Sequence, residues 1–150
     1  MSPVVAAIVA SLDEGGRILV VKQSTGPFAG AWLLPGGEVE RDERVEDAVR
    51  RELREETGYT AAALRAVALY EVRSVPPGRF HILLHMYRAG ELDGAPRAET
   101  GSAVRWIDPR ELDPHPTMAM QLVDLGLIER DGAALFHDLA QIGVEMRRLF

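Results

Sequence analysis

The stretch Gly36-Gly37-Glu38-Val39-Glu40-Arg41-Asp42-Glu43, followed by Arg51-Glu52-Leu53-Arg54-Glu55-Glu56-Thr57-Gly58, decides how this 150-residue chain is interpreted. It predicts a loop that runs into a helix, with acidic residues crowded near the end of that helix. Apolar residues at positions 45, 48, 49 and 53 give the helix one stripe that can face a core. Gly58 is placed to stop the helix, so we expect it to run from position 43 or 44 to about 57.

Three carboxylates dominate this helix. Glu52, Glu55 and Glu56 stand at i, i+3 and i+4, which places them on one face about one turn apart. Their mutual repulsion, and their position near the negative end of the helix dipole, favour a bound cation. Mg²⁺ and Mn²⁺ prefer such oxygen ligands and retain water for exchange with substrate phosphates. For the triad by itself, a solvated face of Arg and Glu side chains is the alternative interpretation.

The spacing of the whole stretch adds to this argument. Gly36 and Gly37 can bring bare backbone close to an ion or a phosphate. From Gly37 onward the chain follows Gly-x5-Glu-x7-Arg-Glu-U-x-Glu-Glu-x-Gly-U, where U is a large aliphatic residue. Seven fixed positions, each matched by chance about 7% of the time, coincide on the order of 10⁻⁸ times per starting point. Residues 37–59 therefore closely resemble the Nudix box. Only the last aliphatic position departs, where Tyr59 stands, and we expect this change to affect local packing rather than chemistry.

The resemblance implies a fold and a metal-dependent activity. Nudix hydrolases form an α/β/α sandwich with a mixed β-sheet. They use Mg²⁺ or Mn²⁺ to cleave a nucleoside diphosphate linked to another group. The box glutamates of the family bind the metal, which here implies Glu52, Glu55 and Glu56. The carbonyl before the box glycine is often a further ligand, and here it belongs to Gly36.

Four residues of the box are expected to be structural. The early glutamate of the family usually pairs with its arginine, which here implies an ion pair between Glu43 and Arg51 that holds the loop against the helix. Gly37 opens the box and Gly58 closes its helix. The similarity extends through the flanking strands to about residue 112.

The expected reaction also needs a general base. Water attacks phosphorus in a pyrophosphate bridge, and metal ions stabilise the charge that builds on the phosphoryl oxygens. The family places its base variably, so the candidates here are Glu55, Glu56 and Glu99, which lies seven residues ahead of Trp106. An ordinary loop acid is the alternative interpretation of Glu99. Together with Glu52, these residues form the expected catalytic group.

Four residues outside the box are candidates for substrate binding. Lys22 ends a predicted strand near the expected cleft and could meet a phosphate, although a solvated lysine is the alternative. Phe28 and Trp32 could stack on a base, although core packing is the stronger interpretation of Trp32. His81 is the fourth candidate. It shares one face of a predicted strand with His85, which favours a structural or cleft-wall role over a metal site.

Composition restricts the partners. The net charge of −6 argues against a long nucleic acid and leaves room for a small phosphorylated nucleotide bound through metal. The chain has no cysteine, which fits a cytoplasmic protein. Its apolar start lacks a basic region and is too short to span a membrane, so we expect no membrane association. A monomer and a homodimer are both compatible with this composition.

The remaining pattern predicts a single domain over residues 1–150. Residues 4–22 resemble a hairpin of two strands. Further strands are expected at 31–34, 61–74, 80–88 and 104–107. C-terminal helices are expected over about 116–150, the last of them at 133–149.

The substrate is less well defined. The short single domain looks most like the nucleoside-triphosphate pyrophosphohydrolases of the family, so we predict an NTP or dNTP substrate, with pyrophosphate and a nucleoside monophosphate as products. Pro76 and Pro77 nearly match the spacing of a proline in ADP-ribose hydrolases. A hydrolase of ADP-ribose or of dinucleoside polyphosphates is therefore the first alternative. A non-catalytic, nucleotide-sensing Nudix domain is the second, and the complete set of box glutamates argues against it.

Overall fold

The computed structural model describes residues 2–99 and 102–150, which contain three helices and ten strands. The strands are β1 (Val4–Ala10), β2 (Ile18–Lys22), β3 (Trp32–Leu33), β4 (Gly36–Glu38), β5 (Tyr59–Ala61), β6 (Leu64–Ser74), β7 (His81–Ala89), β8 (Leu92–Gly94), β9 (Val104–Ile107) and β10 (Val144–Arg148). The helices are α1 (Val45–Thr57), α2 (Pro116–Asp124) and α3 (Gly132–Gln141).

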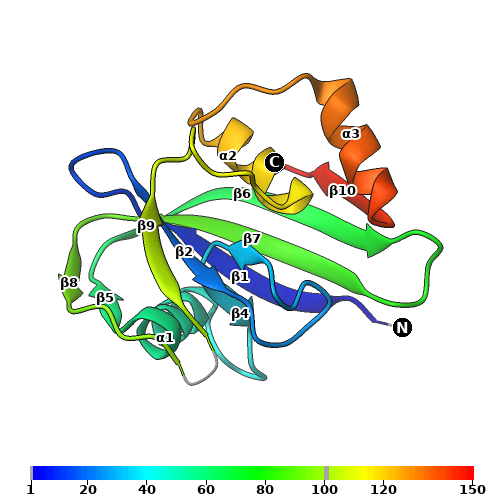
Figure 1. Cartoon of the computed structure of the whole chain (residues 1–150). Coiled ribbons are helices and arrows are strands. Elements are labelled where there is room, and N and C mark those ends of the chain that lie inside the picture. The colour runs from blue at the N-terminus through cyan, green and yellow to red at the C-terminus, as the bar shows by residue number, and fades with distance from the viewer. Residues whose placement is uncertain (1, 100–101) are drawn as a thin grey trace.

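The largest sheet has five strands in the order β10-β6-β7-β1-β4 (Figure 1). β1 runs parallel to β7, whereas the other neighbouring pairs are antiparallel, so the sheet is mixed as predicted. In the β1–β4 pair, Ile8 lies opposite Gly36 and Ala7 lies opposite Gly37. The glycine pair thus belongs to an edge strand, which corrects the expectation of a loop.

The predicted hairpin over residues 4–22 is wrong beyond its turn. The turn forms, since the Asp13 N–H donates to the Arg17 carbonyl at 2.9 Å, and Leu12 bridges to Ile18. β2 then leaves β1 and joins a second sheet in the order β3-β2-β9. Four consecutive residues of β2, from Ile18 to Val21, are buried. A strand with two apolar faces is stabilised between layers rather than in a half-exposed hairpin.

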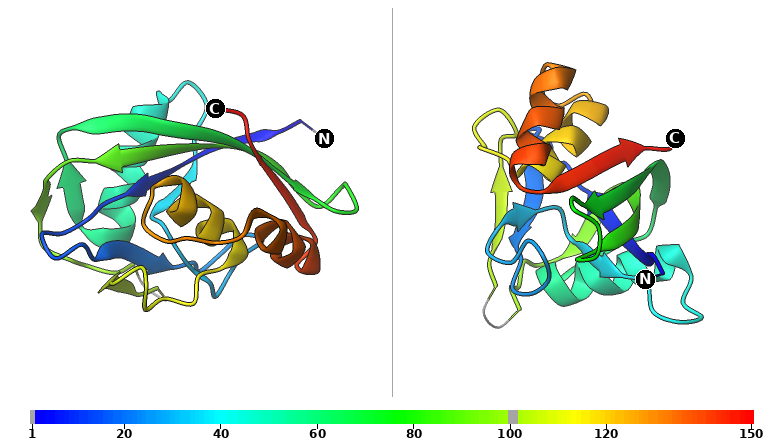
Figure 2. Two further views of the ribbon diagram at one scale, coloured as in Figure 1. Left: turned by 90° about the horizontal axis from the view of Figure 1, so that it is seen from above. Right: turned by 90° about the vertical axis from the view of Figure 1, so that its right-hand side faces the viewer.

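Helices lie on both faces of the layer formed by the sheets (Figure 2). On one face, Val49 and Leu53 of α1 pack in a cluster that includes Val9. On the other face, Met118 of α2 packs in a cluster that includes Tyr70. Helices on both sides of a mixed sheet confirm the predicted α/β/α sandwich.

The end of the chain differs from the prediction of C-terminal helices over about 116–150. α2 and α3 are helices, but α3 ends at Gln141, and Gly143 turns the chain with a φ of 71°. Val144 and Met146 are then buried while Glu145 between them is exposed, which is the period of a strand. The strand β10 pairs antiparallel with β6 and becomes an edge of the main sheet.

Candidate functional site

The acidic helix forms as the sequence predicts. Ala48, Val49 and Leu53 are buried against the sheet and fix which face of α1 points outward. Gly58 ends the helix with a φ of 80°, and its N–H donates to the Arg54 carbonyl at 2.9 Å. The last turn of α1 therefore has a fixed position beside β4.

Glu56 is the buried member of the acidic group. The residue is only 8% exposed, and its Oε1 accepts a hydrogen bond from the Gly36 N–H at 2.7 Å. Burial raises the pKa of Glu56 to about 8 despite this hydrogen bond, and the charges of Glu52 and Glu99 add to the increase. The protein alone therefore does not provide enough favourable interactions to offset the cost of burying the ionised Glu56 carboxylate.

Glu52 lies against the second glycine of the pair. A Cβ atom on Gly37 would approach Glu52 Oε1 to 2.6 Å, so a glycine is needed to leave room for the carboxylate. Burial raises the pKa of Glu52, and the Arg51 guanidinium, whose Nη1 donates to Glu52 Oε1 at 3.0 Å, partly offsets this. The charges of Glu55 and Glu99 raise the pKa of Glu52 further.

Arg51 joins the loop to the helix. Its Nε and Nη2 donate to the two carboxylate oxygens of Glu43 at 2.8 and 3.0 Å, and Nη2 also donates to the Glu38 carbonyl at 3.1 Å. These bonds hold the pKa of Glu43 at about 2, with help from the Glu40 N–H. The structure therefore contains the Arg51–Glu43 pair that the resemblance implied, in the two-pronged geometry that favours arginine. Glu55 lies at the exposed rim, 3.4 Å from Arg51 Nη1.

Glu99 approaches this group from a different part of the chain. It lies in the segment between β8 and β9, is exposed, and is close enough for its charge to raise the pKa of both Glu52 and Glu56. The fold thus brings a loop acid to the helix acids that precede it by more than forty positions.

The donor set fits a hard divalent cation. All candidate donors are oxygen atoms, and burial together with neighbouring carboxylates raises the pKa of two of the carboxyl groups, Glu52 and Glu56. In the described ranges 2–99 and 102–150, no three His, Cys, Asp or Glu side chains are already grouped around one point. Arg51 reaches both Glu52 and Glu55 instead.

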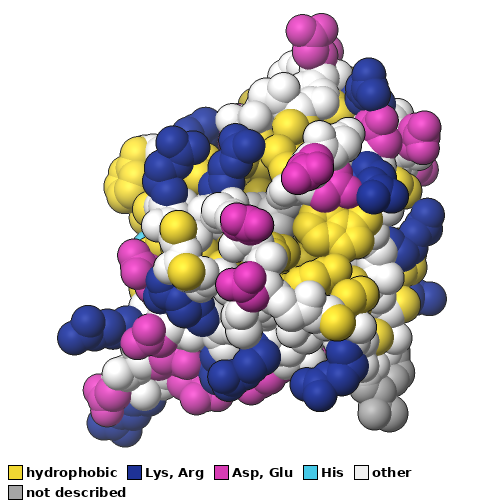
Figure 3. All heavy atoms as spheres, turned by 90° about the vertical axis from the view of Figure 1, so that its left-hand side faces the viewer, with side chains coloured by type: hydrophobic (Ala, Val, Ile, Leu, Met, Phe, Trp, Pro, Cys, Tyr) yellow, Lys and Arg dark blue, Asp and Glu magenta, His cyan; other side chains and the backbone are white. Residues whose placement is uncertain are grey.

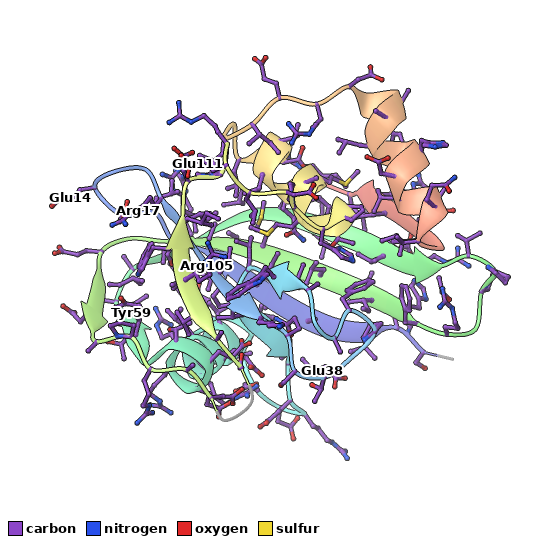
Figure 4. The ribbon with its side chains drawn as sticks, in the orientation of Figure 1. Glu14, Arg17, Glu38, Tyr59, Arg105 and Glu111 are labelled. Atoms are coloured by element: carbon purple, nitrogen blue, oxygen red, sulfur yellow. The ribbon has the colours of Figure 1, made fainter. Side chains whose placement is uncertain are left out.

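Two of the predicted substrate-binding residues lie side by side on neighbouring strands. Lys22 at the end of β2 is opposite Trp32 of β3, and Lys22 is exposed. Trp32 is half-buried against the core, and the Arg105 guanidinium lies 5.3 Å from the centre of its ring. Figure 4 shows Arg105 at β9. Trp32 therefore combines core packing with a cationic neighbour.

Phe28 lines an open cavity of about 240 Å³ that the sequence did not predict. The cavity is also lined by Arg79, Phe80 and His115. The ring of Phe28 lies 5.7 Å from that of Phe80, edge-on, and 4.7 Å from that of His115. These residues come from three distant segments, so only the fold brings them together. The one local signal was His115 before Pro116, a typical helix start.

His81 does not join the acidic group. Its Nε2 lies 2.8 Å from Glu71 Oε2, which lowers the pKa of Glu71. Ala7 of β1 pairs with Gly37 on one side and with His85 of β7 on the other. The histidine in register with the glycine pair is therefore His85. His81 is therefore engaged in a cross-strand pair at the start of β7.

Tyr59, the departure from the box pattern, has a specific partner. The Trp106 Nε1–H donates to the Tyr59 hydroxyl at 3.1 Å, and the two rings meet edge-on with centres 5.8 Å apart. Tyr59 belongs to β5, and Figure 4 shows it close to α1. The larger residue thus locks β5 to β9 beside the helix.

The molecular surface near α1 mixes both signs of charge. Figure 3, seen from the side of β5 and β8, shows Lys and Arg side chains interspersed with Asp and Glu around apolar groups. This face has no continuous basic field of the kind that binds long nucleic acids. None of the helices in the described part of the chain has the length and apolar character needed to cross a bilayer.

Comparisons with known proteins identify the family. A model of the NUDIX domain matches residues 1–125. The chain is 34% identical over 130 residues to a CTP pyrophosphohydrolase of Escherichia coli (strain K12), covering 86% of this chain and 90% of that protein. It is 38% identical over 72 residues to an ADP-ribose pyrophosphatase of Methanocaldococcus jannaschii, covering 48% of this chain and 42% of that protein.

A solved structure agrees. A MutT NUDIX hydrolase from Burkholderia pseudomallei superposes with a TM-score of 0.73 and 31% identity, covering 86% of this chain and all of the other. Three observations agree on the same family: the matched box residues, the α/β/α sandwich and the family model. The chain therefore belongs to the Nudix hydrolase family.

Proposed function

We propose that this chain is a pyrophosphohydrolase of nucleoside triphosphates, either NTP or dNTP, with Mg²⁺ or Mn²⁺ as its cofactor. Hydrolases of this family generally need a divalent metal ion. One observation supports the metal site in this proposal: beside the glycine pair, burial raises the pKa of Glu52 and of Glu56, and the charge of Glu99 adds to the increase at both. Such a group favours a cation, and a polyphosphate substrate increases that requirement.

The residues for the cofactor come from α1 and β4. Glu52, Glu55 and Glu56 would hold the ion, with the Gly36 carbonyl as a further oxygen ligand. When bound, a divalent ion supplies charge stabilisation for the phosphoryl oxygens and a lower pKa for coordinated water. Arg51 keeps Glu52 and the preceding loop in place through its bonds to Glu43.

The chemical step needs a base from the chain. Water forms a new bond to phosphorus, the bridging P–O bond breaks, and the bridging oxygen leaves with the pyrophosphate. Glu99 takes the proton of the attacking water in this proposal, because it is exposed and approaches the acidic group from a separate loop. Glu55, which is also exposed, and Glu56 are the alternatives.

The cavity around Phe28 is a candidate for the part of the site that holds a base. Its volume of about 240 Å³ is below the roughly 300–1,000 Å³ that encloses drug-sized ligands, so it suits one part of a substrate, such as a base. Phe28 and Phe80 offer aromatic surface for stacking. Lys22, the last residue of β2, and Arg105, an exposed residue of the neighbouring strand β9, are the cations that would attract phosphate groups.

Hydrolysis of ADP-ribose is the main competing activity. The similarity to the ADP-ribose pyrophosphatase spans about half of this chain, whereas the similarity to the CTP pyrophosphohydrolase spans most of it. The latter therefore supports the triphosphate substrate. A non-catalytic sensing role is disfavoured because Glu52, Glu55 and Glu56 are all present.

The test is turnover with a panel of NTPs, dNTPs, ADP-ribose and dinucleoside polyphosphates, in Mg²⁺ and in Mn²⁺, with identification of the products. We expect pyrophosphate and a nucleoside monophosphate from a triphosphate. Glu55→Gln and Glu56→Gln should each lower kcat by about 10²-fold or more while the fold is kept. Glu46→Gln, an exposed change at the other end of α1, is the matched control. If both site variants kept full activity, the assignment of Glu55 and Glu56 as metal ligands would be wrong. A preference for ADP-ribose would show that the proposed triphosphate substrate is wrong.

A further inference from the structure

The chain between β8 and β9 is held at two points by residues that are distant in sequence. It carries Glu99, the base in the proposed reaction, and it passes α1 on its way to β9 (Figure 1). One anchor lies before Glu99 and the other lies after it. Together they restrict the positions that the Glu99 carboxylate can take.

The anchor before Glu99 is the C-terminal turn of α1. The Arg97 N–H donates to the Thr57 carbonyl at 2.7 Å, so an amide of the segment satisfies one of the last carbonyls of the helix. The segment also packs directly on the turn, since a Cβ atom on Gly58 would approach the Ala95 carbonyl oxygen to 2.5 Å. Glu99 follows this contact closely in the chain and therefore stays near the helix of the box glutamates.

The anchor after Glu99 is Ser102. Its hydroxyl donates to the Lys22 carbonyl at 2.6 Å. Its N–H donates to the Glu99 carbonyl at 3.0 Å, which closes a turn. The next residue continues the contact with β2, since the Ala103 carbonyl accepts from the Lys22 N–H at 3.0 Å. One serine thus joins the residue that carries the proposed base to the end of β2.

The end of β2 is held independently of this serine. Lys22 pairs with Trp32 of the neighbouring strand β3. The residue after Lys22 donates a backbone hydrogen bond of 2.9 Å to the residue before Trp32. These contacts do not involve the Ser102 hydroxyl. Its loss would therefore loosen the attachment of Glu99 and leave Lys22 in place.

Glu99 needs such a restraint because neighbouring charges oppose its approach. Its side chain is exposed, and it is close enough to Glu52 and Glu56 for its charge to raise the pKa of both. Like charges repel, so the Glu99 carboxylate would move outward if its backbone were free. The two anchors oppose this movement through backbone atoms on either side of the residue.

We propose that Ser102 is a positioning residue for the hydrolysis, because its bond to the Lys22 carbonyl holds Glu99 where it can take the proton of the attacking water. This inference rests on the proposed function, in which Glu99 is the base. The Ser102 hydroxyl contacts neither the substrate nor the metal ion in this role and acts only through Glu99. A general base must lie within hydrogen-bond reach of the proton that it takes, so even a small displacement lowers the rate.

Kinetics of three variants at position 102 test the role of the hydroxyl. Ser102→Ala and Ser102→Val remove it, whereas Ser102→Thr keeps it in nearly the shape of valine. One hydrogen bond typically shifts an equilibrium by about 2- to 10-fold, so kcat should fall by about this factor in the first two variants, with KM within about 2-fold of wild type. Ser102→Thr should retain the wild-type kcat. Ser24→Ala, which changes an exposed serine near Lys22, is the control.

A double-mutant cycle separates action through Glu99 from a general structural effect. In the Glu99→Gln protein, Ser102→Ala should cause little further loss of kcat, because the base that Ser102 positions is already absent. If the two losses multiplied instead, Ser102 would act independently of Glu99 and the proposal would be wrong. The substrate for these measurements is the compound that the panel identifies, so a different substrate preference leaves this test intact.

Amide hydrogen exchange measured by NMR tests the anchor without reference to activity. The Ser102 amide, which donates to Glu99, should exchange faster in Ser102→Ala and Ser102→Val than in the wild type and Ser102→Thr. Equal exchange in all four proteins would contradict the anchor. Full activity of Glu99→Gln would overturn both the choice of base and the positioning role. If Glu99→Gln were impaired while Ser102→Ala and Ser102→Val kept the wild-type kcat, the positioning role alone would be overturned.

Discussion

Glu56 and Gly36 are joined by a hydrogen bond of 2.7 Å that connects the last turn of α1 to the edge strand β4. The bond satisfies one carboxylate oxygen, but burial still raises the pKa of Glu56 to about 8. The same contact that fixes the geometry of the site therefore leaves its charge incompletely balanced. This combination links the stability of the protein to pH and to added cations.

Without metal, the free energy of unfolding should fall as the pH rises from 4.5 through about 8, because the folded state keeps on Glu56 a proton that the unfolded chain has released. Urea unfolding in a chelator, repeated across this range, measures the effect. Glu56→Gln cannot ionise and should lack this component. Adding Mg²⁺ should flatten the wild-type profile. Parallel profiles for the wild type and the variant would show that Glu56 does not carry the linkage.

The two glycines should respond differently to substitution by alanine. In Gly36→Ala the new Cβ would meet the Ala7 carbonyl oxygen, a backbone atom that cannot move aside, so we expect a loss of about 1–3 kcal/mol or more in the free energy of unfolding. In Gly37→Ala the Cβ would meet the movable carboxylate of Glu52 at 2.6 Å. Stability should change little there, whereas kcat should fall about 10²-fold as Glu52 is displaced.

Chemical denaturation and steady-state kinetics on the same preparations separate these outcomes. Gly30→Ala is a useful control for positive φ without steric contact, since nothing lies within 4 Å of its Cβ position. Equal effects of Gly36→Ala and Gly37→Ala on stability would contradict the distinction.

Arg51→Lys should lower kcat by about 10- to 100-fold and reduce the Tm, because lysine cannot make the paired bonds to Glu43 and also reach the Glu38 carbonyl. Arg54→Lys, an exposed change on the same helix, provides the comparison. Differential scanning calorimetry and kinetics measure both quantities. An Arg51→Lys protein with wild-type kcat would mean that the loop holds its position without the guanidinium.

Local signals in the sequence predicted the acidic helix well. The apolar stripe through Val49 and Leu53 and the stop at Gly58 are contained within one segment, so they do not depend on distant contacts. β10 shows the opposite case. Residues 133–149 have enough apolar character for a helix, but Gly143 interrupts it, and β6 offers an edge for Val144 to Arg148. That edge exists only after the sheet has formed.

The candidate site likewise has parts that the sequence predicts and parts that depend on the fold. The box positions of Glu52 and Glu56 follow from helical spacing, and their positions on α1 agree with it. The meeting of Phe28, Phe80 and His115 around one cavity depends on how loops from three elements converge, which no single stretch encodes. The cross-strand bond between His81 and Glu71 likewise depends on the register of β6 and β7.

His115 should make the stability of α2 depend on pH. Its Nδ1 accepts a hydrogen bond from the Thr117 N–H at 3.3 Å at the start of the helix, and burial lowers the pKa of the imidazole below 6.5. Below pH 6.5 the unfolded chain takes up a proton that folded His115 resists, so stability should fall as the pH decreases through this range. His115→Asn keeps a helix-capping side chain but cannot titrate. The difference between the two unfolding free energies should therefore shrink from neutral to acid pH, and a constant difference would mean that His115 is protonated equally in both states.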